Sequence, residues 1–131
     1  MSSDYSIGEI LISEQEIAAR VRALAERIVL DTRSAPKGEL LMVGILNGAV
    51  IFLSDLVRCM PPELDVGIDF MAISSYGSTT KSSGVVRIIK DLSANIEGKD
   101  VLIVEDIIDT GLTLSYLLDA MQARKPARLR T

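Results

Sequence analysis

Two adjacent carboxylates follow a short apolar run near the end of the chain. The run covers Val101 to Val104, and the carboxylates are Glu105 and Asp106. Four consecutive apolar residues are typical of a strand that is buried on both faces of a parallel sheet. Carboxylates at the end of such a strand lose hydration and repel each other unless a ligand or a cation meets them. Because ligands of open α/β sheets bind at the carboxyl ends of the strands, the pair is a candidate ligand-binding site.

A third carboxylate, Asp109, comes next in the chain, and Thr110, Gly111 and Thr113 follow it. A periodic apolar run over 114–124 then predicts a helix. Backbone N–H groups at the start of a helix bind anions, and a glycine lets a phosphate approach the backbone closely. Carboxylates beside a phosphate site indicate a ligand that has both hydroxyl groups and phosphate.

The composition is that of an ordinary globular protein. The chain has 131 residues, 48% of them hydrophobic and 24% charged, which favours a single domain with one core. Its 14 basic and 18 acidic residues give a net charge of −4, which argues against a nucleic-acid partner. Histidine is absent, so a His-based triad is excluded and a catalytic base must be a carboxylate, Lys, Tyr or Cys.

The remaining composition signals concern the thiol and the cellular setting. Cys59 is the single cysteine, so it forms no internal disulfide, and its apolar helical surroundings predict a buried thiol. The first residues lack a secretory signal, and no apolar run is long enough to span a bilayer. We therefore expect a cytoplasmic protein without a membrane partner.

Alternating helix and strand patterns predict an α/β fold. The capping-box spacing of Ser13 and Glu16 opens a helix that extends to Leu30. The later predicted elements are strands over 40–46, 64–71, 85–90 and 101–104, helices over 49–60 and 114–124, and a strand that begins within 127–131. Right-handed crossovers place helices on both faces of a mainly parallel sheet.

The segment EDIIDTG, from Glu105 to Gly111, resembles the phosphoribosyl-pyrophosphate signature of the type I phosphoribosyltransferases. The sequence of this segment is similar to that of the hypoxanthine-guanine phosphoribosyltransferases in particular. The resemblance covers roughly residues 7–131 and includes the segments 44–56, 74–84 and 90–92. It implies a single domain with the α/β core of that family and a mobile lid loop.

The resemblance assigns a role to each part of the signature. Glu105 and Asp106 would bind the ribose hydroxyls of phosphoribosyl pyrophosphate. Asp109 would be the catalytic residue, contacting N7 of the purine and taking or steering its proton as N9 attacks the ribose. The 5-phosphate would be held by Asp109, Thr110, Gly111, Leu112 and Thr113.

One further loop matches the family's pyrophosphate loop, and it consists of Leu46, Asn47 and Gly48. In the family the peptide after Leu can be cis, and Lys is common where this chain has Asn47. The positive charge that would steady the departing pyrophosphate is therefore missing here, whereas a backbone N–H contact is retained.

Another loop matches the family's lid, which closes over the reacting centre and excludes water. Ser75 and Tyr76 begin it, and the Ser- and Thr-rich sequence continues to Gly84. Lys90 and Asp91, further on, resemble residues that lie beside the active site.

Each assignment has a simpler structural alternative. The carboxylate pair could be a solvated strand end, a helix cap or a metal-binding acidic pair, and Asp109 could be only a helix cap. Asn47 and Gly48 could form an ordinary turn, and the segment 74–84 an ordinary disordered loop.

The reaction implied by the resemblance is purine salvage, in which hypoxanthine or guanine and phosphoribosyl pyrophosphate give IMP or GMP and pyrophosphate. Mg²⁺ would bridge pyrophosphate oxygens and ribose hydroxyls, held largely by substrate and water, with Glu105 and Asp106 contributing indirectly. The alternatives are a non-catalytic regulator that binds phosphoribosyl pyrophosphate and an inactive α/β fragment.

Members of the family continue well beyond the position of Thr131. Their continuation carries the Lys and the aromatic residue that recognise a 6-oxopurine, an Asp near the metal and the remaining strands, so the purine preference stays open. We favour a shortened chain over one completed by a second polypeptide or a natural remnant. A sheet that ends within 127–131 would expose an edge and apolar faces, which predicts oligomerisation or aggregation. We expect a homo-oligomer, either a dimer or a tetramer.

Overall fold

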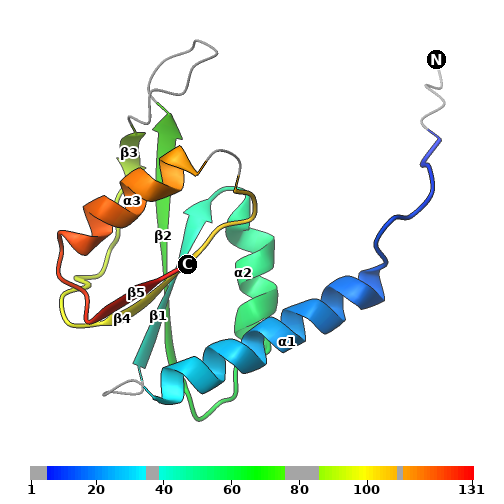
Figure 1. Ribbon diagram of the computed structural model, residues 1–131, viewed down its shortest axis with the longest axis horizontal. Coiled ribbons are helices and arrows are strands. Elements are labelled where there is room, and N and C mark those ends of the chain that lie inside the picture. The colour runs from blue at the N-terminus through cyan, green and yellow to red at the C-terminus, as the bar shows by residue number, and fades with distance from the viewer. Residues whose placement is uncertain (1–5, 35–38, 76–85, 109–110) are drawn as a thin grey trace.

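The computed structural model describes residues 6–34, 39–75, 86–108 and 111–131. Over these residues, helices and strands alternate as the sequence predicts (Figure 1). The helices are α1 (Glu14–Arg33), α2 (Ala49–Arg58) and α3 (Leu112–Gln122). The strands are β1 (Glu39–Leu46), β2 (Asp65–Ser75), β3 (Val86–Lys90), β4 (Asp100–Val104) and β5 (Arg128–Arg130).

The described strands form one sheet with the order β3-β2-β1-β4-β5. The central strand β1 pairs in parallel with β2 on one side and with β4 on the other. The strand β5 is parallel to β4, and among the described strands only β3 is antiparallel to its neighbour, β2. The predicted α/β fold with a mainly parallel sheet is therefore confirmed.

Successive side chains of the central strands point to opposite faces of the sheet, and different helices cover the two faces. Met42 of β1 and Leu102 of β4 pack with α1 and α2. Val43 and Ile103, their neighbours in sequence, pack with α3 on the other face. Figure 1 shows α2 and α3 on opposite sides of the strands. Because both faces are covered, β1 and β4 are apolar along almost their whole length, as the sequence predicts for buried parallel strands.

An ion-pair network holds the short strand β5 in place. Asp100 begins β4, and its side chain is only 6% exposed. Its carboxylate accepts hydrogen bonds from Arg128 Nη2 at 2.6 Å and from Arg130 Nη2 at 2.9 Å. Arg128 also donates to the backbone carbonyl of Asp31 in α1, at 2.8 Å. The strand expected to begin within 127–131 is thus present, and it is tied to both β4 and α1.

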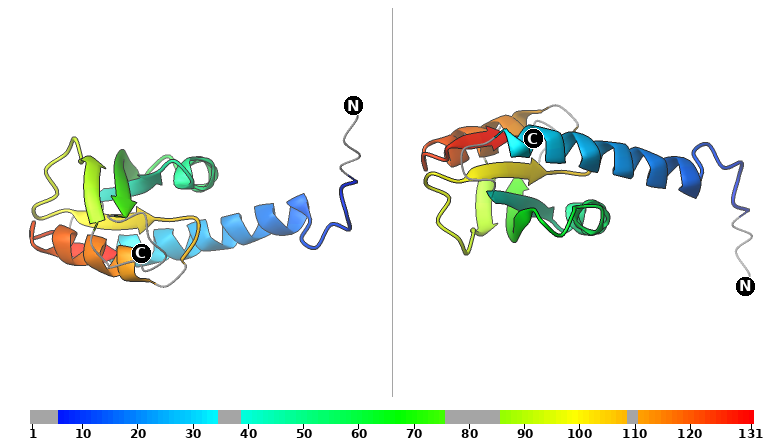
Figure 2. Two further views of the ribbon diagram at one scale, coloured as in Figure 1. Left: turned by 90° about the horizontal axis from the view of Figure 1, so that it is seen from above. Right: turned by 90° about the horizontal axis from the view of Figure 1, so that it is seen from below.

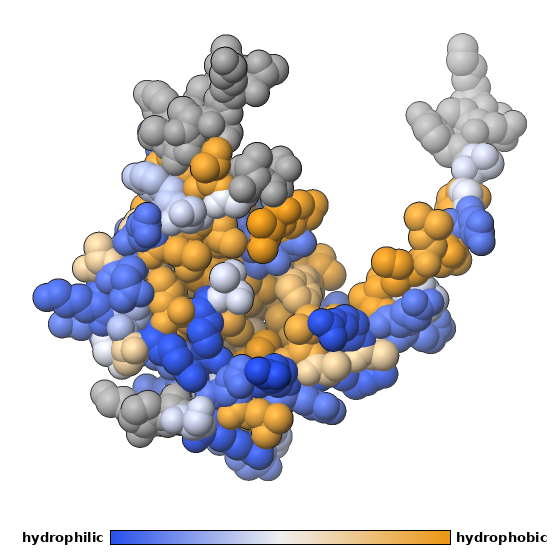
Figure 3. Space-filling model, viewed as in Figure 1, coloured by the Kyte–Doolittle hydropathy of each residue, from blue (hydrophilic) through white to orange (hydrophobic). Residues whose placement is uncertain are grey.

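The helix α1 extends away from the sheet toward its N-terminal end, and residues 6–13 form an arm there that turns away from the helix axis (Figure 2). The capping box predicted at the start of α1 is confirmed, because the Glu16 N–H donates to Ser13 Oγ at 3.1 Å. Side chains of the arm are open to solvent, with Ile7 93% and Leu11 89% exposed. Figure 3 shows hydrophobic residues along this arm.

Two expectations from the sequence need correction. The Cys59 thiol is exposed rather than buried, because Cys59 ends α2 and the buried side of that helix is formed by Leu53 and Leu56. The helix α3 begins at Leu112 rather than at residue 114, because Gly111 is its N-cap. None of the described helices is long and apolar enough to cross a membrane.

Candidate functional site

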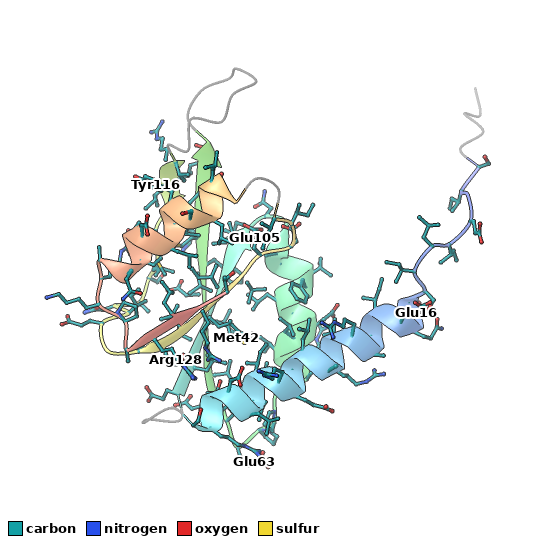
Figure 4. All side chains as sticks on the ribbon, viewed as in Figure 1. Glu16, Met42, Glu63, Glu105, Tyr116 and Arg128 are labelled. Carbon is teal, nitrogen blue, oxygen red and sulfur yellow. The ribbon has the colours of Figure 1, made fainter. Side chains whose placement is uncertain are left out.

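The pairing of β1 with β4 brings two segments to one rim of the sheet. Gly44 of β1 lies opposite Val104 of β4, and the two strands run in the same direction. Residues 46–48 close β1, and Glu105 and Asp106 follow β4, so both segments leave the sheet at its carboxyl end. Figure 4 shows Glu105 just beyond the end of β4, on the side where α2 begins.

The two segments are in contact at Gly48. A Cβ atom built on Gly48 would lie 2.8 Å from the Cγ atom of Asp106, closer than a real Cβ atom approaches a neighbour. The Asp106 carboxylate therefore lies directly against the residue that precedes α2. The predicted pyrophosphate loop and the predicted ribose-binding pair thus form one surface.

The backbone of the predicted pyrophosphate loop is a tight turn. The peptide between Leu46 and Asn47 is cis, as the resemblance allows for this loop. The Asn47 carbonyl accepts a hydrogen bond from the Val50 N–H at 3.2 Å, and Gly48 is the N-cap of α2. The turn leaves Asn47 and Gly48 exposed at the rim, where a ligand can reach them.

Glu105 is half-buried, whereas Asp106 is exposed. Burial raises the pKa of Glu105 to about 7, and the Asp106 carboxyl adds to this shift through a hydrogen bond and through charge repulsion. The hydrogen bond from the Asp106 N–H to Glu105 Oε1, at 3.1 Å, acts in the opposite direction. Near neutral pH, and without a bound ligand or cation, the pair therefore carries less than its full negative charge.

The start of α3 is open to an approaching group. Gly111 has a φ of 81°, a left-handed conformation that glycine adopts readily. A Cβ atom on Gly111 would meet no described atom within 4 Å. Leu112 and Thr113 form the first turn of α3, at the positive end of the helix dipole. This placement suits the phosphate site that the sequence predicts.

Some predicted site residues lie outside the described residues. They are Asp109, Thr110, and Tyr76 with the rest of the predicted lid. Ser75 ends β2, which extends past the end of β1 because Leu46 lies opposite Ala72. The roles expected for these residues stay predictions from the sequence.

The sequence analysis missed a buried carboxylate in β2. Asp69 is 6% exposed, and it accepts hydrogen bonds from the Ser93 and Ala94 N–H groups at 2.9 Å each. These bonds tie β2 to the segment that follows β3, so they brace the two strands that flank residues 76–85. A signal was present, because Asp69 shares a strand face with Met71, which is fully buried.

Lys90 and Asp91 are engaged in contacts within the protein. Lys90 Nζ donates to the Phe70 carbonyl at 3.0 Å. Asp91 forms a two-bond ion pair with Arg124, at 2.8 and 2.9 Å, and this pairing lowers the pKa of Asp91. Arg124 lies beyond the C-terminal end of α3, whereas Gly111 lies at its start. Asp91 is thus placed at the end of α3 opposite the predicted phosphate site.

Comparison with known proteins adds a decisive observation, because the family model of the phosphoribosyl transferase domain matches residues 8–131. The chain belongs to the phosphoribosyltransferase family. The hypoxanthine-guanine phosphoribosyltransferase of Dictyostelium discoideum is 48% identical to it over 124 residues, which cover 94% of this chain and 68% of that protein. The resemblance read from the sequence is therefore confirmed.

Solved phosphoribosyltransferase structures share the fold. The hypoxanthine-guanine phosphoribosyltransferase of Bacillus anthracis has a TM-score of 0.84 at 41% identity, covering 95% of this chain and 70% of that one. The hypoxanthine phosphoribosyl transferase of Trypanosoma cruzi, solved in work on how its C-terminal region affects oligomeric state and enzymatic activity, has a TM-score of 0.85 at 40% identity, covering 92% and 65%. This phosphoribosyltransferase chain spans 62–68% of the length of the first curated relatives it matches.

The raised pKa of Glu105 predicts how pH affects stability. Between its usual pKa of 4.5 and about 7, the folded protein binds more of this proton than the unfolded chain. The contribution of Glu105 to the free energy of unfolding is therefore fully present below pH 4.5 and is lost as the pH rises through about 7. Relative to that of Glu105→Gln, the free energy of unfolding of the wild type should fall as the pH rises across this interval. Above the interval, the difference between the two proteins should stay constant.

Urea unfolding of the two proteins at a series of pH values measures this difference. Glu26→Gln, at an exposed position of α1, controls for the loss of one formal charge. A constant difference between wild type and Glu105→Gln from pH 4 to 8 would contradict the assigned environment of Glu105.

Proposed function

We propose that this chain carries the phosphoribosyl-pyrophosphate site of a purine-salvage phosphoribosyltransferase that acts on hypoxanthine or guanine. The observation that carries the proposal is the contact between Gly48 and Asp106, which joins the predicted pyrophosphate loop to the predicted ribose pair. The open start of α3 at Gly111 lies on the segment that follows the same strand. Pyrophosphate, ribose and 5-phosphate are linked in that order in the substrate, so one rim that offers three adjacent subsites suits it.

Each part of the substrate is met by a different group. Glu105 and Asp106 accept hydrogen bonds from the ribose 2- and 3-hydroxyls, since two carboxylates suit a vicinal diol. The start of α3, from Gly111 to Thr113, receives the 5-phosphate, together with Asp109 and Thr110. The diphosphate lies along the pyrophosphate loop, residues 46–48, whose backbone N–H groups are its donors because Asn47 has no charge.

The reaction replaces one bond at the ribose C1 by another. The bond from C1 to the pyrophosphate oxygen breaks, and its electron pair leaves with pyrophosphate. Purine N9 forms the new bond to C1, and the purine loses a proton that Asp109 takes or steers at N7. The lid that begins at Ser75 and Tyr76 excludes water from the positively charged ribose during this exchange.

We propose Mg²⁺ as the cofactor, with Glu105 and Asp106 as its indirect ligands. Among the described residues, no cluster of three or more Asp, Glu, Cys or His side chains is arranged to hold a metal ion. The oxygens of Glu105 and Asp106 are of the kind that Mg²⁺ prefers, and such an ion can be held mainly by substrate oxygens and water. Bound there, the ion would offset negative charge on the leaving pyrophosphate.

Product formation tests the proposal. The chain, and a version extended to the length of its relatives, are incubated with hypoxanthine, phosphoribosyl pyrophosphate and Mg²⁺, and IMP is measured. We expect IMP at least from the longer protein. Mg²⁺-dependent ligand binding without IMP in both would favour the regulator, and absence of binding in both would favour the inactive fragment.

The proton role of Asp109 predicts a split between turnover and binding. We expect Asp109→Asn to lower kcat by roughly 100-fold or more, since general acid–base groups contribute about that much, with a much smaller loss of phosphoribosyl-pyrophosphate affinity. Asp119→Asn, at an exposed position of α3, is the matched control and should change neither quantity. Equal losses of turnover and affinity in Asp109→Asn would refute the role.

We also propose that the protein forms homo-oligomers, in a cytoplasmic setting, through its exposed apolar surface. A cavity of about 310 Å³ lies between α1, α2 and the end of β4, lined by apolar residues that include Leu24, Phe52 and Ile108 and by charged residues that include Glu105. The arm residue Leu11 adds to the exposed apolar surface. Exposed apolar patches are a common mark of an association site.

Sedimentation velocity measures this association. Leu11→Asp should shift the distribution toward the monomer, because a charge opposes burial of the arm. Ser6→Asp places the same charge on the same arm and should behave as the wild type. A wild-type protein that is monomeric at high concentration would overturn the oligomer proposal and leave the transferase proposal unaffected.

A further inference from the structure

We propose that Gly48 is a positioning residue for the Asp106 carboxylate, so that the pyrophosphate loop sets the affinity for ribose as well as for pyrophosphate. The inference rests on the proposed function, because it takes Asp106 as a ligand of the sugar. It adds a role that Gly48 performs without touching the sugar.

The backbone does not explain why residue 48 is glycine. Gly48 has φ −59° and ψ −38°, which are ordinary helical values that any residue adopts. Gly111, in contrast, has a positive φ and open space beside it. The two glycines of the site are therefore required for different reasons, conformation at Gly111 and space at Gly48.

The space beside Gly48 is filled by one carboxylate. A Cβ atom on Gly48 would lie 2.8 Å from Cγ and 2.9 Å from Oδ1 of Asp106, and closer still to Oδ2. All three of its nearest atoms belong to that side chain. The absence of a side chain at residue 48 is thus what admits the Asp106 carboxylate to this place.

A side chain at residue 48 would move the carboxylate rather than disrupt the fold. Asp106 is exposed, so its side chain can rotate away from a methyl group. Its N–H is bonded to Glu105 Oε1 at 3.1 Å, which holds the main chain while the side chain turns. At Gly44, by comparison, an added Cβ would meet the core side chains of Leu53 and Phe70 at 2.8 and 3.2 Å.

The present place of the carboxylate is also electrostatically favourable. Gly48 is the N-cap of α2, and no side chain caps that end by a hydrogen bond. The positive end of the α2 dipole therefore faces the Asp106 carboxylate across Gly48. A rotated carboxylate would lose this attraction and the alignment of Asp106 with Glu105 toward one diol.

Ribose 5-phosphate is the probe that separates the two roles of Gly48, because it has the diol and the 5-phosphate but no pyrophosphate. If Gly48 acts only through its own N–H on pyrophosphate, Gly48→Ala leaves the affinity for ribose 5-phosphate unchanged. If Gly48 positions Asp106, we expect Gly48→Ala to weaken this affinity by about tenfold or more, since hydrogen bonds to charged groups are involved. Isothermal titration calorimetry measures the affinity of each protein for ribose 5-phosphate.

Gly8→Ala is the matched control, because a Cβ there would meet nothing within 4 Å. We expect this variant to bind as the wild type, and we expect Gly48→Ala to melt within a few degrees of the wild type, since only an exposed side chain moves. Wild-type affinity for ribose 5-phosphate in folded Gly48→Ala would overturn the proposal.

A double-mutant cycle identifies the route of the effect. In an Asp106→Ala background, Gly48→Ala should cause no further loss of ribose 5-phosphate affinity, because the carboxylate it displaces is gone. Independent, additive losses would overturn the positioning role.

A measurement without ligand keeps this inference separate from the proposed function. The ¹³C shift of the Asp106 carboxyl carbon should change in Gly48→Ala and stay constant in Gly8→Ala. An unchanged shift would overturn the positioning role, whereas failure of the wild type to bind ribose 5-phosphate would overturn only the proposed ligand.

Discussion

The parallel pairing of β1 with β4 is the constraint on which the candidate site depends. Because Gly44 lies opposite Val104, the residues that follow the two strands reach the same rim of the sheet. The ion pairs of Asp100 with Arg128 and Arg130 hold the other end of β4 against β5 and α1. A shift of this register would separate Asp106 from Gly48 and take the carboxylate pair out of the site.

The same pairing makes the charged form of Glu105 unfavourable in the absence of a ligand. Glu105 follows directly on a fully buried strand, so it loses part of its hydration, and its pKa rises to about 7. A structural strand end has no need of such a group, whereas a binding site does, since a diol or a cation can restore the lost interactions. Burial of β4, which stabilises the fold, thus also prepares the pair to bind.

Most of the fold follows from local patterns in the sequence. The apolar runs of β1 and β4, the capping box at Ser13 and the turn signals around the helices all predicted elements that the structure contains. The family resemblance also indicated the carboxylate pair, the loop at 46–48 and the start of α3. These features depend on residues that are close together in the chain.

What the sequence did not show depends on residues that are distant in the chain. The contact of Gly48 with Asp106 requires the strand register, which a local pattern does not contain. Asp69 was overlooked because its partners, Ser93 and Ala94, come 24 and 25 residues later in the chain. Cys59 was expected to be buried because the apolar character of α2 was considered without the direction of its buried face.

The affinities of the protein for ribose 5-phosphate and for 2-deoxyribose 5-phosphate, compared by calorimetry, test most directly whether Glu105 and Asp106 bind a sugar diol. The two ligands differ only in the 2-hydroxyl. If the two carboxylates bind the diol, the deoxy sugar should bind at least about tenfold more weakly, because a hydrogen bond to a charged group contributes roughly 1.5–3 kcal/mol. Equal affinities for the two sugars would contradict a ribose site at this rim.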